Sequence, residues 1–348
     1  MLLEGLHLPL TTPFYPDGRL NLRKLEHNVA SYSKTPVAGL AVLSSHGEPT
    51  MLSDEETRQV LKTAIEAAAA EKVMLAGVCR DSVLETMALA DHAAALSYDV
   101  ALVRAPSFLR TGLSTKQRKE LLTYFQTVAD RSALPLVLDS TSIPVELLTE
   151  LASHARVIGL IDSNTTSQRI EQLKKGTASI AHEVTVTPIF AAVTRRMLAQ
   201  QQAATMLSAD MLIGNGAALA VALSTPAMKA QKTRTKVVGF QLLAGNAGTM
   251  LDALLAGAVG AMPAFAACAP QACYEVFAAW KDGDHGLAEE KQARLQSAAK
   301  YFEDSGVAGI KYGCDVNGYF GGTARLPLLP PGGEDRTEIE SLLEGIRN

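Results

Sequence analysis

Short apolar runs and segments of helical periodicity alternate along the first half of this chain. Each apolar run ends in small, polar or glycine residues, and the helical segment after it repeats its apolar residues every three or four positions. Apolar runs without a polar face are typical of parallel strands that are covered on both sides. The predicted strands are 6–14, 39–48, 73–79, 100–104, 136–138 and 157–161. The alternation therefore predicts an α/β domain with a parallel sheet, either closed or open.

Composition limits the kinds of partner. The net charge of -4 gives no basic surface for nucleic acid, and no apolar run reaches the roughly 18 residues that a membrane helix needs. The N-terminus lacks a basic region followed by an apolar core, so no signal peptide is expected. The 4 cysteines include no Cys-x-x-Cys pair, which indicates free thiols. We expect a cytoplasmic protein that binds a small metabolite.

The run 39–48 ends in a distinctive polar loop. Its apolar residues give way to Ser-Ser-His-Gly-Glu at 44–48, and a Ser-Asp-Glu-Glu helix start follows at 53–56. This order is typical of a buried parallel strand that carries a polar loop at its carboxyl end. We interpret the loop as part of a binding or catalytic site.

The same segment resembles the second strand of the dihydrodipicolinate synthase and N-acetylneuraminate lyase family, in which Gly-Thr-Thr-Gly-Glu or Gly-Ser-Thr-Gly-Glu precedes Leu-Ser-x-Glu-Glu. Other family landmarks follow in order, namely Thr12-Pro13-Phe14, Gly245-Asn246, Gly257-Ala258-Val259-Gly260 and Arg325-Leu326-Pro327-Leu328. The resemblance covers most of the chain outside one insert. It implies a TIM (β/α)8 barrel with a C-terminal helical region, and the activity of an aldolase-type lyase acting on a 2-oxo acid such as pyruvate.

The resemblance also implies the domain organisation. It places the barrel at 1–268 and the helical region at 269–348, with a largely helical insert at about 176–236 before the seventh strand. Because connections of this length usually carry structure of their own, we expect an oligomer contact or an extra helical cap there. The seventh strand is assigned to 240–244, although 212–216 has a similar sequence.

Three positions depart from the covalent mechanism that the resemblance implies. The family's Schiff-base lysine lies on the sixth strand, where this chain has Ile161. The family's proton-relaying tyrosine lies on the fifth strand, where this chain has Asp139, and a second tyrosine after the fourth strand corresponds to Phe108. Because isoleucine has no nucleophile, we expect the usual Schiff-base chemistry to be lost or altered.

Groups able to bind a small acid remain at the predicted strand ends. Ser45 and His46 occupy the family's two hydroxyl positions, and His46 adds an imidazole that titrates near neutral pH. We assign Asp139 and His46 as catalytic acid and base. The predicted substrate-binding residues are Ser44, Ser45, His46, Phe108, Ser140, Ile161 and Asn246.

An ionised carboxylate that points into a barrel mouth needs an oppositely charged or hydrogen-bonding partner. For Asp139 the candidates by strand position are Arg80, Arg104 and Arg110.

No cofactor or metal is expected. A divalent cation held by carboxylates and imidazole is an alternative, but structural hydrogen bonding is favoured for the two further carboxylates that it would use, Glu48 and Asp162.

Three functions stay open. In order of preference they are an enzyme with altered chemistry on a small 2-oxo or hydroxy acid, a non-catalytic binding or regulatory homologue, and a lyase with a relocated lysine. The lysines that could replace the family's nucleophile lie among polar neighbours in the sequence. This makes them unsuitable, because a Schiff-base lysine needs a buried setting. These candidates are Lys311 and the insert lysines Lys229, Lys232 and Lys236. The resemblance also implies a homo-oligomer, either a dimer or a tetramer.

Overall fold

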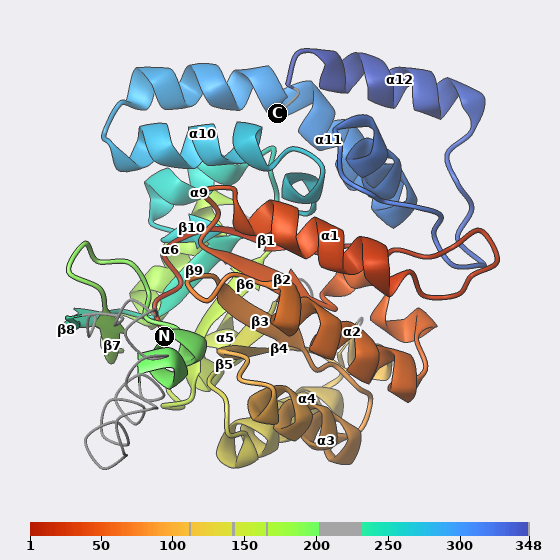
Figure 1. Cartoon of the computed structure of the whole chain (residues 1–348). Coiled ribbons are helices and arrows are strands. Elements are labelled where there is room, and N and C mark those ends of the chain that lie inside the picture. Colours follow the sequence, from red (N-terminus) through yellow and green to blue (C-terminus); the bar gives the residue numbers. More distant parts are fainter. Residues whose placement is uncertain (111–112, 141–142, 165, 202–231, 347–348) are drawn as a thin grey trace, which may run out of the picture.

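Eight parallel strands close into a barrel in the computed structural model, which describes residues 1–110, 113–140, 143–164, 166–201 and 232–346 (Figure 1). Around the barrel the order is β1-β10-β9-β6-β5-β4-β3-β2. The strands are β1 (Gly5–Pro9), β2 (Gly39–Val42), β3 (Val73–Gly77), β4 (Val100–Arg104), β5 (Leu136–Asp139), β6 (Val157–Asp162), β9 (Gln241–Ala244) and β10 (Gly260–Ala261). The predicted TIM barrel is confirmed, and β9 is its seventh strand, as assigned.

Helices cover the outside of the barrel. They are α1 (Leu22–Ser33), α2 (Asp54–Ala67), α3 (Val83–Ala95), α4 (Thr115–Arg131), α5 (Val145–Ala152), α6 (Ser167–Gly176) and α9 (Met250–Ala256). Local sequence fixes several starts: at α2 the Ser53 hydroxyl accepts from the Glu56 amide while the Glu56 carboxylate accepts from the Ser53 amide. The apolar face of α1, formed by Leu25, Val29 and Tyr32, is buried against the strands.

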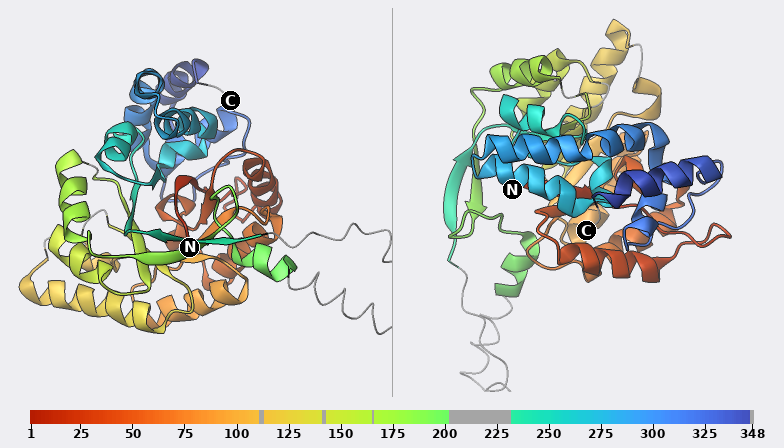
Figure 2. Two further views of the ribbon diagram at one scale, coloured as in Figure 1. Left: turned by 90° about the vertical axis from the view of Figure 1, so that its left-hand side faces the viewer. Right: turned by 90° about the horizontal axis from the view of Figure 1, so that it is seen from above.

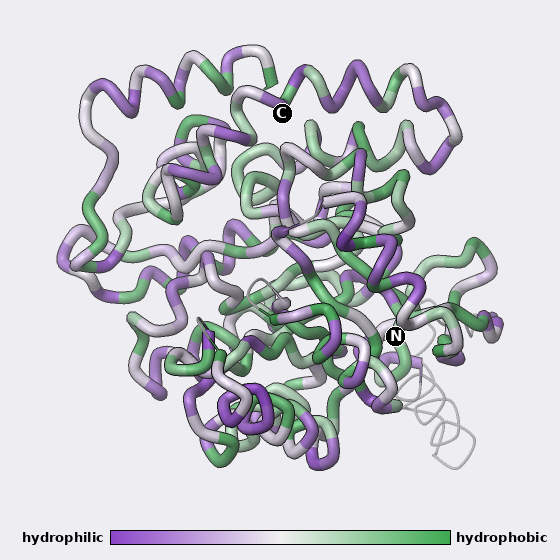
Figure 3. The backbone as a smooth tube through the Cα atoms, turned by 180° about the vertical axis from the view of Figure 1, so that it is seen from behind, coloured by the Kyte–Doolittle hydropathy of each residue, from purple (hydrophilic) through white to green (hydrophobic). Residues whose placement is uncertain are grey.

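The core has two layers, as expected of a closed barrel. Inside the barrel lies one cluster that includes Ala41, Leu75, Leu102, Val137 and Leu243. A larger cluster fills the space between the strands and the helices. Figure 3 shows the consequence, since the outer helices alternate between polar and apolar residues along their length. Among the described residues, no helix is long and apolar enough to cross a membrane.

The C-terminal helices lie together on one side of the barrel, at the top of Figure 1. They are α10 (Pro270–Lys281), α11 (His285–Val316) and α12 (Gly333–Glu344), and α11 is kinked at Gly306, whose φ is 63°. The predicted C-terminal helical region is thus confirmed. The segment after α11 returns to the loops at the strand carboxyl ends, where Arg325 binds.

The described part of the insert lies at the opposite, N-terminal face of the barrel, near the chain start (Figures 1 and 2). An antiparallel pair, β7 (His182–Val186) and β8 (Arg234–Val238), packs on Leu2. Residues 195–201 are helical, as expected. The strand pair was not expected, because the sequence predicts a largely helical insert. Burial alternates along β7, which suits its β-branched residues. The alternative seventh strand 212–216 lies outside the described residues.

Candidate active site at the barrel mouth

Arg104, Asp139 and Ile161 are neighbours on the inner wall at the carboxyl ends of the strands. Leu102 and Val137 belong to the interior cluster, so the residues two positions further along β4 and β5 also face inward. In the register, Asp139 lies opposite Arg104 on β4 and opposite Ile161 on β6. The position to which the resemblance assigns the lysine is therefore apolar, with a carboxylate and then a guanidinium beside it.

A hydrogen-bonded chain joins three side chains across this mouth. The Arg104 guanidinium donates from Nη1 to Ser45 Oγ at 3.0 Å, and Ser45 Oγ donates to Asp139 Oδ2 at 3.2 Å. The Ser45 hydroxyl therefore has its proton directed at Asp139. Of the three arginines considered as partners for Asp139, Arg104 is the one joined to it in this way, because it lies on the neighbouring strand at the same level.

His46 lies half-buried beside this chain, in the short 3-10 turn η1 (Ser45–Gly47). Burial lowers the pKa of its imidazole, and the positive charge of Arg104 lowers it further, while Asp139 acts in the opposite direction. The net shift favours the neutral ring at pH 7. A neutral imidazole is able to accept a proton. The role of His46 as a catalytic base stays a prediction.

The loop that carries Ser44, Ser45 and His46 has an unusual backbone. Leu43 and Glu48 at its two ends have φ values of 58° and 53°, in the left-handed region that costs side-chain-bearing residues energy. Gly77 on β3 makes room for this path, because a Cβ there would lie 1.9 Å from the Leu43 carbonyl oxygen. The loop geometry thus depends on a glycine that is distant in the sequence.

Ser44 is buried at the start of the loop, and its hydroxyl has no hydrogen-bond partner in the part of the chain that the structure describes. A buried polar group without a partner is rare and destabilising. Ser45, by contrast, is exposed at the mouth. The two hydroxyls are candidates to bind an incoming carboxylate, as the sequence predicts.

The C-terminal region holds the far end of this loop through Glu48. The Lys311 ammonium lies 2.5 Å from Glu48 Oε1, and the Arg325 amide donates to Oε2 at 2.9 Å. Lys311 also donates to the Thr323 carbonyl at 2.9 Å and lies 4.4 Å from the Phe14 ring centroid. The Glu48 and Lys311 side chains are both buried, and these contacts hold Glu48 in its left-handed conformation.

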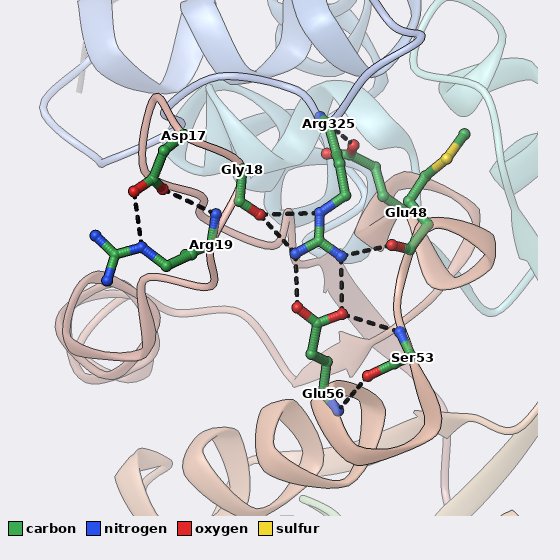
Figure 4. A network of polar contacts seen from close by, with 8 residues as sticks. Asp17, Gly18, Arg19, Glu48, Ser53, Glu56 and Arg325 are labelled. Carbon is green, nitrogen blue, oxygen red and sulfur yellow. Dashed lines mark hydrogen bonds and ion pairs between the residues drawn. The ribbon is translucent and has the colours of Figure 1, made fainter.

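The Arg325 side chain forms a second ion pair, with Glu56, as Figure 4 shows. Its Nη1 and Nη2 donate to the two Glu56 oxygens at 2.8 and 2.7 Å, and Nη2 also donates to the Gly18 carbonyl. These hydrogen bonds lower the pKa of Glu56 to about 2. Arg325 therefore ties the first loop and the start of α2 to the C-terminal region.

Three predicted site residues lie outside this hydrogen-bonded chain. The Ser140 hydroxyl donates to the Ile161 carbonyl at 2.9 Å and so holds β5 to β6. Asn246 donates to Glu303 of α11 at 2.8 Å and accepts from the Gly248 amide. Phe108, in the turn η3 (Ser107–Leu109), is 62% exposed. Their roles in substrate binding stay predictions.

Comparison with known proteins decides the family. A family model described as "Dihydrodipicolinate synthetase family" matches residues 2–182 and 218–346. The chain belongs to the dihydrodipicolinate synthetase family. This membership confirms the resemblance and identifies the chain as a lyase-type member with the aldolase barrel.

Relatives within the dihydrodipicolinate synthetase family span nearly the whole chain at low identity. A 4-hydroxy-tetrahydrodipicolinate synthase from Gluconacetobacter diazotrophicus is 24% identical, covering 99% of this chain and 97% of its own. An L-threo-3-deoxy-hexylosonate aldolase from Hypocrea jecorina is also 24% identical, covering 99% and 95%. The crystal structure of YagE, a prophage protein of E. coli K12 in complex with pyruvate, has a TM-score of 0.76 at 22% identity and covers 99% of each chain. The last similarity shows the fold.

Two alternatives to the family's Schiff-base lysine lose support from the geometry. Lys311 is wholly buried, so the expectation that it lacks a buried setting was wrong. Burial lowers its pKa, but polar neighbours, Glu48 and the Thr323 carbonyl, hold its ammonium. Lys236 pairs with Glu4 at 3.3 Å at the opposite face. Lys232 is exposed, and Lys229 lies outside the described residues.

The carboxylates of the alternative metal site do not converge. Asp162 pairs with Arg169 at 2.5 Å, and Glu48 pairs with Lys311, as favoured from the sequence. Within the described ranges, no three His, Cys, Asp or Glu side chains are placed to hold one metal ion.

Proposed function

We propose that this dihydrodipicolinate synthetase family member binds a small 2-oxo acid at the barrel mouth and acts on it by acid–base chemistry without a Schiff base. The observation that carries the proposal is the inward layer in which Ile161, Asp139 and Arg104 are neighbours. A charged pair stands beside the position where the resemblance places a nucleophile.

The residues at the barrel mouth could together bind the acid, stabilise negative charge and transfer a proton. The hydroxyls of Ser44 and Ser45 and the loop around them would bind the carboxylate of the acid. The Arg104 guanidinium would stabilise negative charge that develops on the carbonyl oxygen. Neutral His46 would remove a proton, and Asp139, through Ser45, would orient and assist the transfer. The acid and base assignments are those that the sequence suggests.

A homologue that binds without turnover is the second candidate. The chain from Arg104 through Ser45 to Asp139 favours it, because these side chains are already hydrogen-bonded to one another. A dimer or tetramer stays a prediction for either function, and size-exclusion chromatography with light scattering would measure it.

The decisive experiment is reductive trapping. The protein would be incubated with pyruvate and other 2-oxo acids, reduced with borohydride and analysed by intact mass, with a trapping family enzyme alongside. We expect no adduct, together with calorimetric binding of pyruvate. Asp139→Asn should abolish turnover of a cognate acid, whereas Asp91→Asn on the exposed surface of α3 should not. An adduct on any lysine would overturn the proposal, and binding without turnover of any acid would favour the second candidate.

A further inference from the structure

A surface pocket of about 400 Å³ lies beside the barrel mouth, at the carboxyl ends of β3 and β4. Its lining includes side chains that the proposed chemistry does not use. It adjoins the mouth through Arg104, which contributes to both. The charged and polar residues of the lining are Thr50, Arg80, Asp81, Arg104, Ser107 and Arg110.

Guanidinium groups outnumber carboxylates in the lining of this pocket. Three guanidinium groups line it with one carboxylate, Asp81. Both oxygens of Asp81 already accept hydrogen bonds from Ser107, at 2.7 Å from its amide and 2.5 Å from its hydroxyl. Asp81 therefore holds the loop after β4. Outside the lining, Asp54 pairs with Arg80, and Asp139 is joined to Arg104 through Ser45.

The three guanidinium groups differ in how they are held. Arg80 is anchored, because it donates to the Cys79 carbonyl and to Thr57 and pairs with Asp54. Arg104 donates from Nη1 to Ser45, while its buried Nε has no hydrogen-bond partner within the described residues. A buried donor of this kind calls for an acceptor.

Arg110 supplies a second donor group to the pocket. It donates from Nε to the Ala105 carbonyl at 3.0 Å, and its Nη atoms form no hydrogen bond to any residue that the structure describes. Burial lowers the pKa of Arg110, and the positive charge of Arg104 lowers it further, while Asp81 and Asp139 act in the opposite direction. Two like charges are thus held near each other, an arrangement that a bound anion would stabilise.

We infer that this pocket binds a small oxyanion, the phosphate or carboxylate group of a metabolite, between Arg104 and Arg110. Guanidinium groups suit such ligands because their planar donors match oxyanion geometry. The anion has two sources: a second acidic group on the ligand of the mouth, or a separate free anion. The inference goes beyond the proposed function and does not require turnover.

Calorimetric titration with inorganic phosphate at low ionic strength tests the site. Wild type should bind phosphate, and Arg110→Gln should weaken binding by about tenfold or more, since a lost charge-assisted contact contributes at least about 1.4 kcal/mol. Arg110→Lys should give an intermediate loss. Arg118→Gln on the exposed face of α4 is the matched control and should bind like wild type. Equal phosphate binding by wild type and Arg110→Gln, or none by wild type, would overturn the inference.

Two further titrations separate the sources of the anion. If the pocket holds a second group of the mouth ligand, Arg110→Gln should weaken 2-oxoglutarate much more than pyruvate. If it holds a free anion, phosphate and pyruvate should bind together, and Arg110→Gln should affect phosphate alone. Either pattern supports the site. A protein that binds phosphate through Arg110 but no 2-oxo acid would contradict the proposed function and leave the anion site intact.

Discussion

Replacing Lys311 with methionine should strongly destabilise the protein, because it leaves the Glu48 carboxylate buried without its cation. The two side chains are 0% and 2% exposed, and their charged atoms lie 2.5 Å apart. Breaking a buried pair from one side typically costs about 3–5 kcal/mol. The chain has 348 residues, for which the unfolding entropy is about 0.7 kcal/mol per kelvin. Lys311→Met should therefore lower Tm by about 4–7 °C.

The double variant separates the pair from the packing. Lys311→Met with Glu48→Gln removes both charges, so its loss should be smaller than the sum of the two single losses by about 2 kcal/mol or more. Differential scanning fluorimetry and circular dichroism would measure Tm, with Lys300→Met on the exposed face of α11 as the control. A Lys311→Met protein within about 1 °C of wild type, or strictly additive losses, would refute the reasoning.

Three of the four further predictions concern the site and its supports, and the last concerns the insert. Glu56 has its pKa lowered from 4.5 to about 2 by Arg325, so it contributes stability above pH 4.5 that is lost as pH falls toward 2; Glu56→Gln should cost about 1–2 kcal/mol at pH 7 and flatten that acid dependence in urea unfolding. Burial lowers the His46 pKa, so turnover of a 2-oxo acid should persist as pH falls to 6.5 and decline only below it. His46→Gln should strongly reduce turnover, and its residual rate should lack this decline at low pH. Gly77→Ala should displace the Leu43 backbone and cost about 2 kcal/mol or more, seen as weakened pyruvate binding together with a lower Tm, whereas unchanged binding would contradict the close approach. Arg196 donates to the carbonyls of Ala68, Ala69 and Lys72 at 2.6–2.8 Å, so Arg196→Met should increase hydrogen exchange at the end of α2, with Arg131→Met as the exposed control.

The sequence by itself determined the order of strands and helices, and the family resemblance that it carries implied the closed barrel, which periodicity alone left open. Apolar runs without a polar face can be stable only as covered parallel strands, and they alternate with helices that have one apolar face. Local signals also placed helix starts, as at Ser53 and Glu56, because caps involve residues three positions apart. The residues at strand ends could be named for the same reason: the carboxyl ends of parallel strands meet at one face of a barrel.

Partners across the barrel depended on the tertiary structure. Three arginines were candidates for Asp139, and only strand register decides that Arg104 lies opposite it and reaches it through Ser45. The signal for Arg104 was present, as a charged residue at the inward end of a strand, but the sequence could not rank it. The arginine pocket was missed because its residues come from different loops.

The burial of charged side chains also could not be predicted from the sequence. Lys311 stands among residues typical of an exposed helix, yet the kinked α11 and the returning segment enclose it completely, and Glu48 compensates its charge. The insert likewise could cover either end of the barrel until packing on Leu2 and the Lys236 pair with Glu4 placed its described part at the N-terminal face. Sequence periodicity reports which face of an element is buried, whereas contacts between distant segments are set by how the closed barrel brings their loops together.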